Sequence, residues 1–286
     1  MAGRPNWMLV DGSSMIFRAF FALPVSMTSP DGRPVNGVRG LLDRLASLLM
    51  TRHPRSLAVA TDEDWRPAWR VKALPTYKSH RVAEPIPPQL APQMPLIEAV
   101  LGAIGLNVIG AKDFEAEDVI ASLVAKVETP IEIASGDRDL FALVRDRDVI
   151  VLYPEKGGLK EVDEAEIERR YGIPGRAYAD FAILRGDPSD GLPGVPGIGE
   201  KTAAGMVRRY GGLDGMLAAL NWSPEIVDYV KRARTVVAPV TNIELPPPQP
   251  GLPAKPADPE KLEKLTRELG IEASVGRLLA ALAANA

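Results

Sequence analysis

The sequence contains no cysteine and only two histidines, His53 and His80, among its 286 residues. The lack of cysteine excludes a disulfide scaffold, a zinc site made of thiolates and a nucleophilic thiol. With so few histidines, a histidine-rich metal site and a histidine-based proton relay are not expected either. Ligands for a metal, if the chain binds one, must therefore come mainly from carboxylates.

The sequence also lacks a continuous run of about 18 apolar residues and a basic-then-apolar N-terminus, the patterns of a membrane span and of a secretory signal. These absences predict a cytoplasmic protein that does not enter a membrane. Neither sign of charge dominates, because 34 Lys and Arg stand against 37 Asp and Glu and give a net charge of −3. A role in nucleic-acid binding would therefore have to come from the local placement of charge.

Three short apolar runs in the first half of the chain each end in an aspartate. They are WMLVD, ending at Asp11, SLAVATD, ending at Asp62, and PIEIASGD, ending at Asp137. Short, nearly continuous apolar runs of this kind are typical of buried parallel strands. Further runs at 106–109 and 149–153 predict two more strands.

Helical patterns lie between these runs, at 37–51, 89–104 and 116–127, and take over after about residue 160. The alternation predicts an α/β fold in residues 1–172, with a mostly parallel central sheet flanked by helices. Residues 173–286 are predicted to form a helical region. A helix is expected at 162–171, just before this region, and further helices within it are expected at 175–184, 200–210, 213–220, 224–234, 259–269 and 273–283. The proline-rich segment 246–259 is expected to be extended.

Acidic residues gather in three further motifs. These are DFEAED, with Asp113, Glu115, Glu117 and Asp118; SGDRDL, with Asp137 and Asp139; and GDPSDGLPG, with Asp187 and Asp190. Taken one at a time, these acids have ordinary explanations as helix caps, first-turn residues or turn residues; Asp139, for example, would cap a helix DLFALV. Taken together they are expected to crowd, because the carboxyl ends of parallel strands meet at the edge where α/β sheets place their functional crevice.

A divalent cation would relieve the repulsion among crowded carboxylates. Oxygen ligands without His or Cys favour a hard ion, so the residues predict Mg²⁺ or Mn²⁺ rather than Zn²⁺. The acids are numerous enough for two or more ions, and paired ions about 3.5–4 Å apart suit phosphodiester hydrolysis. The alternative is a solvated acidic surface that holds no metal.

Cations and aromatic residues alternate in the segment 65–81, WRPAWRVKALPTYKSHR. It carries no acid, and its cations and aromatic residues are Arg66, Arg70, Lys72, Lys78, Arg81, Trp65, Trp69 and Tyr77. Bases stack on aromatic rings while Lys and Arg contact phosphates, so the segment predicts binding of single-stranded nucleic acid. The alternative is a solvated loop with two core tryptophans.

The string GLPGVPGIGEKTA, at 191–203, is the most specific motif of the chain. Glycines permit a close backbone approach, and the amides at the start of the helix that follows attract phosphate. The string is similar to a helix-hairpin-helix element, which holds the DNA backbone without reading its sequence. It is not a P-loop, because the glycine spacing and the preceding strand are absent. The alternative is a tight turn between two helices.

Taken in order, the motifs resemble the bacterial 5′–3′ exonuclease and flap endonuclease family, which includes the N-terminal nuclease domain of DNA polymerase I. The motifs that carry the resemblance are VDGSSMIFRAF, YKSHR, FEAEDVIASL, SGDRDL and GDPSDGLPGVPGIGEKTA. The resemblance implies a PIN-like, Rossmann-like nuclease core with a helical arch at about 65–95. It also implies a helix-three-turn-helix element at about 184–210 that binds duplex DNA.

The same resemblance implies roles for individual residues. The metal-facing carboxylates would be Asp11, Asp62, Glu115, Glu117, Asp118, Asp137, Asp139, Asp187 and Asp190. The cations Arg18, Lys78 and Arg81 would contact the scissile or adjacent phosphates, with Lys78 stabilising developing charge. Contacts to DNA are expected from Arg66, Arg70, Lys72, Tyr77, Gly194, Gly197, Gly199, Lys201 and Thr202. Similar proteins place a K⁺ ion on the carbonyls of this turn.

The implied activity is a structure-selective DNA 5′-nuclease, acting as an exonuclease and a flap endonuclease in primer removal and repair. A monomer is expected, with DNA polymerase I or ligase as protein partners and no polymerase domain after the nuclease region. Two residues depart from the family pattern: Glu117 stands where the family commonly has Asp, and Thr61 stands where it has Phe. The longer side chain of Glu117 would move its carboxylate and retune the metal pair.

Two other functions remain open on the sequence alone. One is a non-catalytic module that binds branched DNA and keeps a vestigial acidic crevice. The other is a small-molecule phosphohydrolase with an aspartyl nucleophile after its first strand. The DGS that follows Val10 lacks the second aspartate expected for that chemistry, and the glycine-rich turn would stay unexplained.

Overall fold

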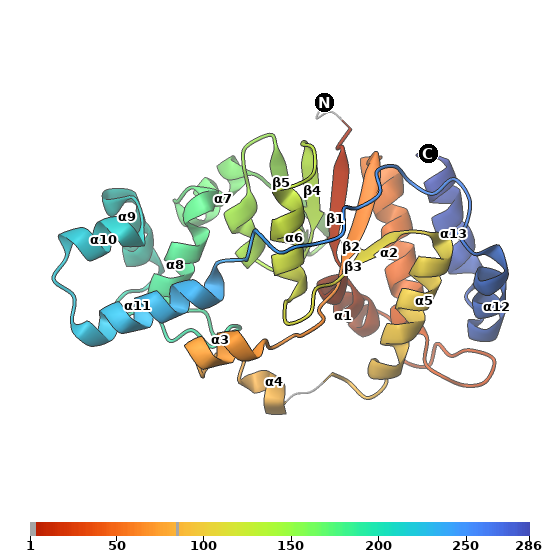
Figure 1. Ribbon diagram of the computed structural model, residues 1–286, viewed down its shortest axis with the longest axis horizontal. Coiled ribbons are helices and arrows are strands. Elements are labelled where there is room, and N and C mark those ends of the chain that lie inside the picture. Colours follow the sequence, from red (N-terminus) through yellow and green to blue (C-terminus); the bar gives the residue numbers. More distant parts are fainter. Residues whose placement is uncertain (1–3, 84–85) are drawn as a thin grey trace.

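The protein is described here by a computed structural model, which covers residues 4–83 and 86–286 and contains a six-stranded sheet in the order β3-β2-β1-β4-β5-β6 (Figure 1). The strands are β1 (Trp7–Asp11), β2 (Ser56–Ala60), β3 (Asn107–Ile109), β4 (Ile131–Ala134), β5 (Val149–Glu155) and β6 (Gly158–Val162). Pairing is parallel except between β5 and β6. The strand order reverses between β1 and β4, which is where an open α/β sheet places its crevice.

The central strands β1, β2 and β4 are buried at every position because both faces of the sheet are covered. Alternate residues of β1 point to opposite faces: Met8 and Val10 belong to one buried cluster, while Trp7 and Leu9 belong to the other. The first cluster is completed by α1 (Gly12–Ala22), α2 (Asn36–Arg52), α5 (Met94–Ile104), α12 (Pro259–Leu269) and α13 (Glu272–Ala283). The second includes α6 (Ala116–Val124) and the helical region.

The remaining helices follow the predicted ranges with shifted ends, except for two short helices inside the expected arch at about 65–95, for which no separate ranges were predicted. They are α3 (Ala68–Ala73), α4 (His80–Ala83), α7 (Glu164–Tyr171), α8 (Tyr178–Arg185), α9 (Glu200–Tyr210), α10 (Leu213–Ala219) and α11 (Pro224–Val237), with 3₁₀ turns at Ala91–Gln93, Asp139–Leu143 and Gly175–Ala177. Within the described residues, none of these helices is long and apolar enough to cross a bilayer. Asp139 is the first residue of a 3₁₀ turn and does not cap an α-helix, so that expectation was wrong.

Helix α1 and strand β6 are among the elements that were not predicted. Helix α1 follows β1 without a loop, because the Asp11 carboxylate accepts a hydrogen bond from Ser14 N at 2.9 Å and caps the helix directly. Strand β6 is exposed at four of its five positions, so its sequence carries no apolar pattern. The antiparallel pairing with β5 across a turn that contains Gly157 places it at the sheet edge, shortly before the chain becomes helical.

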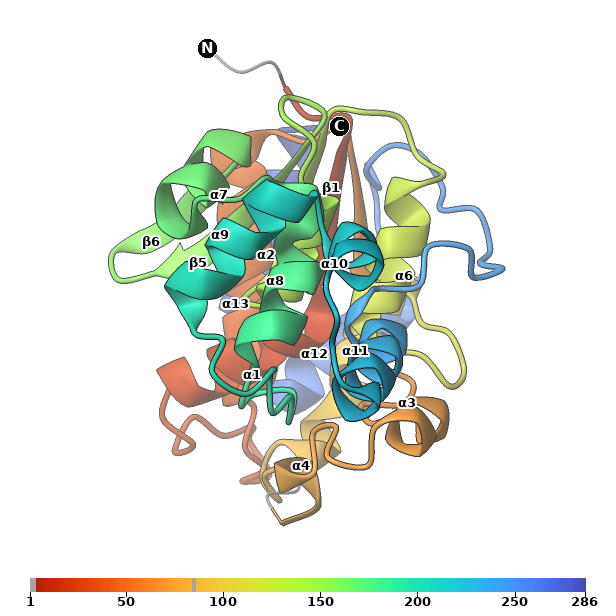
Figure 2. The same ribbon diagram turned by 90° about the vertical axis from the view of Figure 1, so that its left-hand side faces the viewer.

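The helical part of the chain is divided in space. Helices α8 to α11 group at one side of the sheet, and they lie in front of it in Figure 2. Helices α12 and α13 instead pack on α5 and α2 at the other side (Figure 1). The connection between the two parts is extended, as predicted, and its Gln249 exchanges two hydrogen bonds with the Asn107 side chain of β3.

The arch segment, which we define as residues 65–95, crosses the carboxyl edge of the sheet (Figure 1). Its described part contains α3, α4, the 3₁₀ turn at Ala91–Gln93 and the start of α5, while residues 84 and 85 lie outside the described residues. Helix α3 packs beside α11 of the helical region. The arch segment therefore lies between the α/β core and the helical region.

A close backbone contact joins the arch segment to the turn after α8. Lys78 N donates to Asp190 O at 3.1 Å, and the neighbouring Gly191 has a φ of +71°. A side chain on Gly191 would overlap the carbonyl oxygen of Thr76. Only glycine fits here, for both its φ and its size. The contact places the Asp190 carboxylate next to the Lys78 side chain.

We expect Gly191→Ala to lower the free energy of unfolding by roughly 2–4 kcal/mol, since it adds a steric overlap to an unfavourable φ. The measurement is urea denaturation followed by circular dichroism. Gly211→Ala is the matched control, because Gly211 has a φ of +73° and no neighbour within 4 Å of the added Cβ. It should cost only about 1–2 kcal/mol. Equal losses in the two variants would contradict the close contact.

Candidate metal centre

A cavity of about 1090 Å³ opens beyond the carboxyl ends of β1 and β4. Asp11 is the last residue of β1, and Asp137 follows β4 by three residues. The acids that line the cavity are Asp11, Asp62, Glu115, Glu117, Asp137 and Asp190. The structure therefore brings the three strand-end aspartates together, as the parallel sheet predicted.

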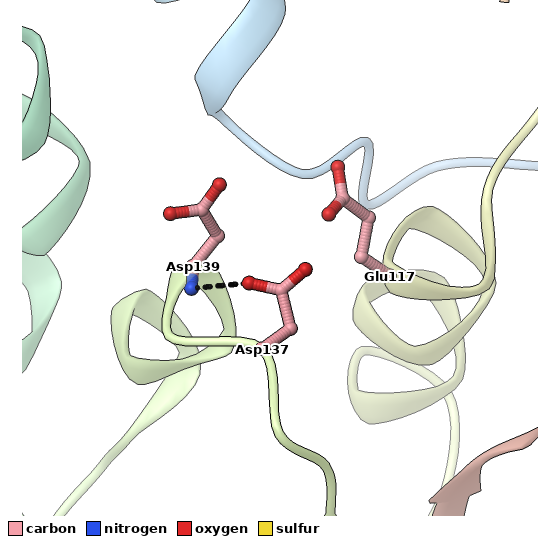
Figure 3. Close-up of side chains that lie close together, drawn as sticks. All are labelled: Glu117, Asp137 and Asp139. Carbon is pink, nitrogen blue, oxygen red and sulfur yellow. Dashed lines mark hydrogen bonds between the residues drawn. The ribbon is translucent and has the colours of Figure 1, made fainter. Parts of the chain in front are cut away.

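Three carboxylates lie especially close together (Figure 3). Glu117, Asp137 and Asp139 each offer an oxygen, and these oxygens lie within 4.8 Å of one another. Glu117 comes from the first turn of α6, and the two aspartates come from the loop and 3₁₀ turn after β4. Asp139 N donates to Asp137 Oδ1 at 2.9 Å, which fixes the shape of the loop.

Local hydrogen bonds hold the other acids in place. Ser135 Oγ donates to Asp11 Oδ2 at 2.5 Å and accepts from Asp137 N at 2.9 Å, so one buried hydroxyl links two strand ends. Asp62 Oδ1 accepts from Ala116 N at 2.7 Å, which ties the end of β2 to the start of α6. Each acid is therefore oriented by the backbone of a neighbouring element.

Burial and mutual repulsion make these acids difficult to ionise together. Burial, with the neighbouring carboxylates of Asp62 and Asp137, raises the pKa of Asp11 to about 7. Burial and nearby acids also raise the pKa values of Glu117 and Asp139 well above their ordinary range. The side chain of Asp190, next to Asp139, adds to this effect and favours the protonated form of Asp139 by its charge and by hydrogen bonding. Ionising these acids together is therefore unfavourable unless positive charge lies nearby.

Cations of the arch segment lie beside these acids and offset part of their negative charge. Lys78 Nζ lies 2.7 Å from Glu115 Oε1 and 3.6 Å from Asp190 Oδ1, and its side chain is buried. Arg81 Nη1 lies 3.3 Å from the same Glu115 oxygen, and its guanidinium covers the Trp65 ring. Burial opposes the ionisation of Glu115, but Lys78 and Arg70 outweigh it and hold the pKa of Glu115 below its ordinary value.

Two of the predicted metal ligands face away from the cavity. Asp118 is fully buried, and its oxygens accept from Arg70, from Glu115 N and from Val240 N. Asp187 pairs with Arg138 and Arg185 and accepts from Ser189. Neither carboxylate lines the cavity. Direct metal contact by Asp118 and Asp187 stays a prediction, and in this structure their oxygens have protein partners.

Two predicted DNA contacts of the arch segment are also buried. Arg70 has no exposed surface, and Tyr77 is 2% exposed with its hydroxyl donating to Glu115 Oε2. Base stacking on Tyr77 and phosphate contact by Arg70 stay predictions, while in this structure both side chains are buried against acids of the chain. Trp69 donates from Nε1 to Asp113 O. Of the three aromatic residues, only Trp65 lines the cavity.

The other predicted contacts differ in their exposure. Gly194 is buried, and its N–H donates to Tyr229 Oη at 3.0 Å, so it supports the glycine-rich turn from inside. Arg66 is half-buried, and its Nε donates to Tyr77 O at 2.9 Å. The exposed members of the predicted set are Lys72, Gly197, Gly199, Lys201 and Thr202, and Arg18 is an exposed residue that lines the cavity.

Sequence reasoning missed several residues of the site. Arg44, on α2, lines the cavity, and the burial of its guanidinium together with nearby Arg18 lowers its pKa. Ser135 begins the SGD motif that contains Asp137. A small polar residue at the end of a buried strand could have indicated that its hydroxyl contacts the neighbouring acids. Tyr229 lies 35 residues after Gly194, and nothing in the local sequence marks their contact.

The residues present fit a hard divalent cation. Carboxylate oxygens converge from α6 and from the loop after β4, and protons or cations must compensate their charge in the protein alone. Neither histidine is in the three-carboxylate group. Mg²⁺ and Mn²⁺ prefer such oxygen ligands, whereas Zn²⁺ usually takes N or S ligands.

Comparisons with known proteins agree with this geometry. Residues 6–172 match the family described as the 5′-3′ exonuclease N-terminal resolvase-like domain, and residues 173–243 match the 5′-3′ exonuclease C-terminal SAM fold. A Streptomyces coelicolor protein named 5′-3′ exonuclease is 46% identical, over 97% of this chain and 100% of that protein. The chain belongs to the 5′–3′ exonuclease family. It is a nuclease, and dependence on divalent metal is typical of this family.

Other relatives extend the comparison. A 5′-3′ exonuclease of Mycobacterium tuberculosis is 43% identical over 98% of each chain, whereas DNA polymerase I of Mycobacterium bovis is 41% identical over 75% of this chain and 24% of that protein. The bacteriophage T5 D15 flap endonuclease, solved with DNA and metal ions, aligns with a TM-score of 0.66 at 17% identity over 97% of this chain and 99% of that one. The resemblance to the 5′–3′ exonuclease family is thus confirmed, and the structural match confirms the nuclease fold.

Without divalent metal, the buried acids should make this exonuclease less stable as the pH rises. The pKa of Asp11 is about 7 in the folded chain and 3.8 in the unfolded one, so the folded state binds more protons between these values and loses that advantage as the pH rises. We expect Tm in EDTA, measured by calorimetry, to fall by about 4 °C or more from pH 5.5 to pH 8.

Glu166, an acid with a lowered pKa, does not cancel the predicted fall of Tm with rising pH. Hydrogen bonds from Arg169, against a small burial effect, lower the pKa of Glu166 to about 2, so its contribution is complete above about pH 4.5 and is constant in the measured range. Added Mn²⁺ should raise Tm more at pH 8 than at pH 5.5. A Tm in EDTA that rises with pH would contradict the crowding of acids.

Proposed function

We propose that the chain is a structure-selective DNA 5′-nuclease that cleaves phosphodiester bonds with two Mg²⁺ or Mn²⁺ ions. The observation that carries the proposal is the close approach of Glu117, Asp137 and Asp139, at the edge of a cavity that Glu117, Asp137 and further acids line. Flap endonucleases of bacteriophage T5 and Methanococcus jannaschii share the fold, which supports a branched or nicked substrate. Both exonuclease and flap-endonuclease activity belong to the proposal.

The carboxylates would hold the ions from two sides. Glu117, Asp137 and Asp139 would bind one ion. Asp11 and Asp62 would complete the site from the other strand ends, and Glu115 from the N-cap of α6. Asp190 would contribute from the turn after α8. Bound divalent ions supply an activated water and stabilise the leaving oxygen. The protein's own part is to fix the oxygens in place, which the hydrogen bonds of Ser135 and of the α6 backbone do.

The cations of the cavity would hold the phosphates. Lys78 has a φ of +42° and donates from its backbone to Asp190 O, so its position is fixed at both ends by the turn and by Glu115. A buried ammonium at this place would stabilise charge that develops on the scissile phosphate. Arg81 and Arg18, which also line the cavity, would contact the same or adjacent phosphates.

Duplex DNA would lie against the helical region. Gly197, Gly199, Lys201 and Thr202 are exposed around the start of α9, where backbone N–H groups and the helix dipole favour a phosphate. A K⁺ ion on the carbonyls of this turn is part of the proposal by resemblance.

We place the boundary between the nuclease core and the helical region at about residue 172, with α12 and α13 assigned to the core.

The cellular role would be the removal of primers and the processing of 5′ flaps in replication and repair. The enzyme would act as a cytoplasmic monomer whose product, a nicked duplex with 3′-hydroxyl and 5′-phosphate ends, is a substrate for ligation. DNA polymerase I and ligase are the partners this reaction implies. A non-catalytic DNA-binding module is a weaker proposal, because a vestigial site has no reason to keep so many repelling acids.

Two substitutions separate metal binding from charge stabilisation. Asp137→Ala removes a ligand, so we expect Mn²⁺ binding measured by calorimetry to weaken at least tenfold and cleavage of a 5′-flap oligonucleotide to be abolished. Lys78→Ala keeps all the carboxylates, so Mn²⁺ binding should persist while cleavage slows by about a hundredfold or more. Both variants should still bind the flap DNA in EDTA. Full cleavage by Asp137→Ala, or by the wild type in EDTA, would refute the metal assignment.

A further inference from the structure

Arg70 is a buried cation at the base of the arch segment that the proposed mechanism does not use. Its Nη1 lies 2.6 Å from Glu115 Oε2, and its Nη2 lies 3.0 Å from Glu117 Oε1 and 2.7 Å from Asp118 Oδ1. One guanidinium thus contacts every acid at the start of α6, from the N-cap residue to the third position. Two of these acids line the cavity, and Glu117 also belongs to the three-carboxylate group.

The guanidinium has little freedom to move. It lies over the Trp69 ring at 4.8 Å and near the Tyr77 ring at 5.7 Å, measured to the ring centroids. Trp69 is itself fixed by its hydrogen bond to Asp113 O, in the loop before α6. Because the planar fork presents its N–H groups in fixed directions, it also fixes the directions of the carboxylates that accept from it.

Asp118 connects this cluster to the segment that follows α11. Its Oδ1 accepts from Val240 N at 2.9 Å as well as from Arg70, and its Oδ2 accepts from Glu115 N at 3.2 Å. One turn later on α6, Ser122 Oγ donates to Val240 O and accepts from Ile243 N. The arch segment, the start of α6 and the chain leaving the helical region therefore meet at one carboxylate.

We propose that Arg70 is a positioning residue of the metal centre, and that Asp118 makes this positioning depend on the segment 238–243. Arg70 holds one oxygen of Glu117 at 3.0 Å and leaves the second oxygen for the metal. It also holds Glu115 in place from the side opposite Lys78, which contacts the other oxygen. The proposal rests on the proposed function, since it assigns roles around the same metal site.

A counter-ion role and a positioning role of Arg70 predict different metal affinities for the variant Arg70→Lys. Lysine keeps the positive charge but offers a single ammonium on a flexible stem, which cannot span three carboxylates in fixed directions. If Arg70 acts only as a counter-ion, the lysine variant keeps the metal affinity of the wild type. If it positions Glu115 and Glu117, the affinity falls although the charge is unchanged.

We expect Arg70→Lys to raise the Kd for Mn²⁺, measured by calorimetry on the full chain, by about tenfold. It should also lower kcat on a 5′-flap oligonucleotide while KM changes little, because the DNA-contacting surface is intact. The matched control is Arg52→Lys. Arg52 forms a similar fork with Glu132, near the amino ends of the strands, so its replacement should change stability without changing the Kd for Mn²⁺.

A second variant tests the connection while Arg70 stays in place. Val240→Pro removes the N–H that donates to Asp118 Oδ1, and we expect it to raise the Kd for Mn²⁺ about threefold. Lys126→Gln is its control, because Lys126 Nζ donates to Ile243 O in the same segment but contacts no acid of the α6 start. This control should bind Mn²⁺ like the wild type.

Differences in Kd among the variants test the roles of Arg70 and Asp118, whereas Mn²⁺ binding by the wild type tests the proposed function. A folded Arg70→Lys protein with the wild-type Kd for Mn²⁺ would overturn the positioning role. A Val240→Pro protein with the wild-type Kd would overturn the dependence on the segment 238–243, and so would an equal loss in Lys126→Gln. If the wild type itself binds no Mn²⁺, the metal site fails, and this result is distinct from a difference among variants.

Discussion

Repulsion among carboxylates beyond the carboxyl ends of β1 and β4 is the constraint on which the site depends. Burial raises the pKa values of Asp11, Glu117 and Asp139, so these carboxyl groups bind protons more readily than free ones do. Lys78, Arg81 and Arg70 compensate the charge of Glu115. A divalent ion between the acids would replace the protons, and this exchange links metal binding to pH and to stability.

The fold concentrates these acids because each comes from a different element at the same sheet edge. The strand order reverses between β1 and β4, so loops leave in opposite directions and open a crevice between them. The arch segment then closes one side and brings Lys78 against the turn that carries Asp190. The site is therefore complete only when the core, the arch segment and the start of the helical region are all folded.

The central part of this arrangement could be predicted from the sequence. Asp11, Asp62 and Asp137 follow apolar runs, and in a parallel sheet such positions must share an edge, so local pattern and topology together place them. The glycine-rich turn before α9 was predictable for a similar reason, because glycine and proline mark backbone geometry directly. The domain architecture of the family follows from the order of its motifs.

Burial of polar residues could not be predicted in this way. Arg70 and Tyr77 have the composition of a nucleic-acid contact, yet their partners on α6 lie 45 and 38 residues further along the chain. Local sequence shows a residue's charge but not whether a distant carboxylate will neutralise it. Asp118 was assigned to the metal for the same reason, since its partners Arg70 and Val240 become neighbours only in the folded chain.

An anomalous difference map from a crystal grown with Mn²⁺ at pH 8 tests the central claim most directly. The account predicts a strong peak within coordination distance of Glu117, Asp137 and Asp139, with Arg70 still in contact with the acids of α6. A map from Mn²⁺-containing crystals with no peak among these three carboxylates, or with peaks only on the outer surface, would contradict it.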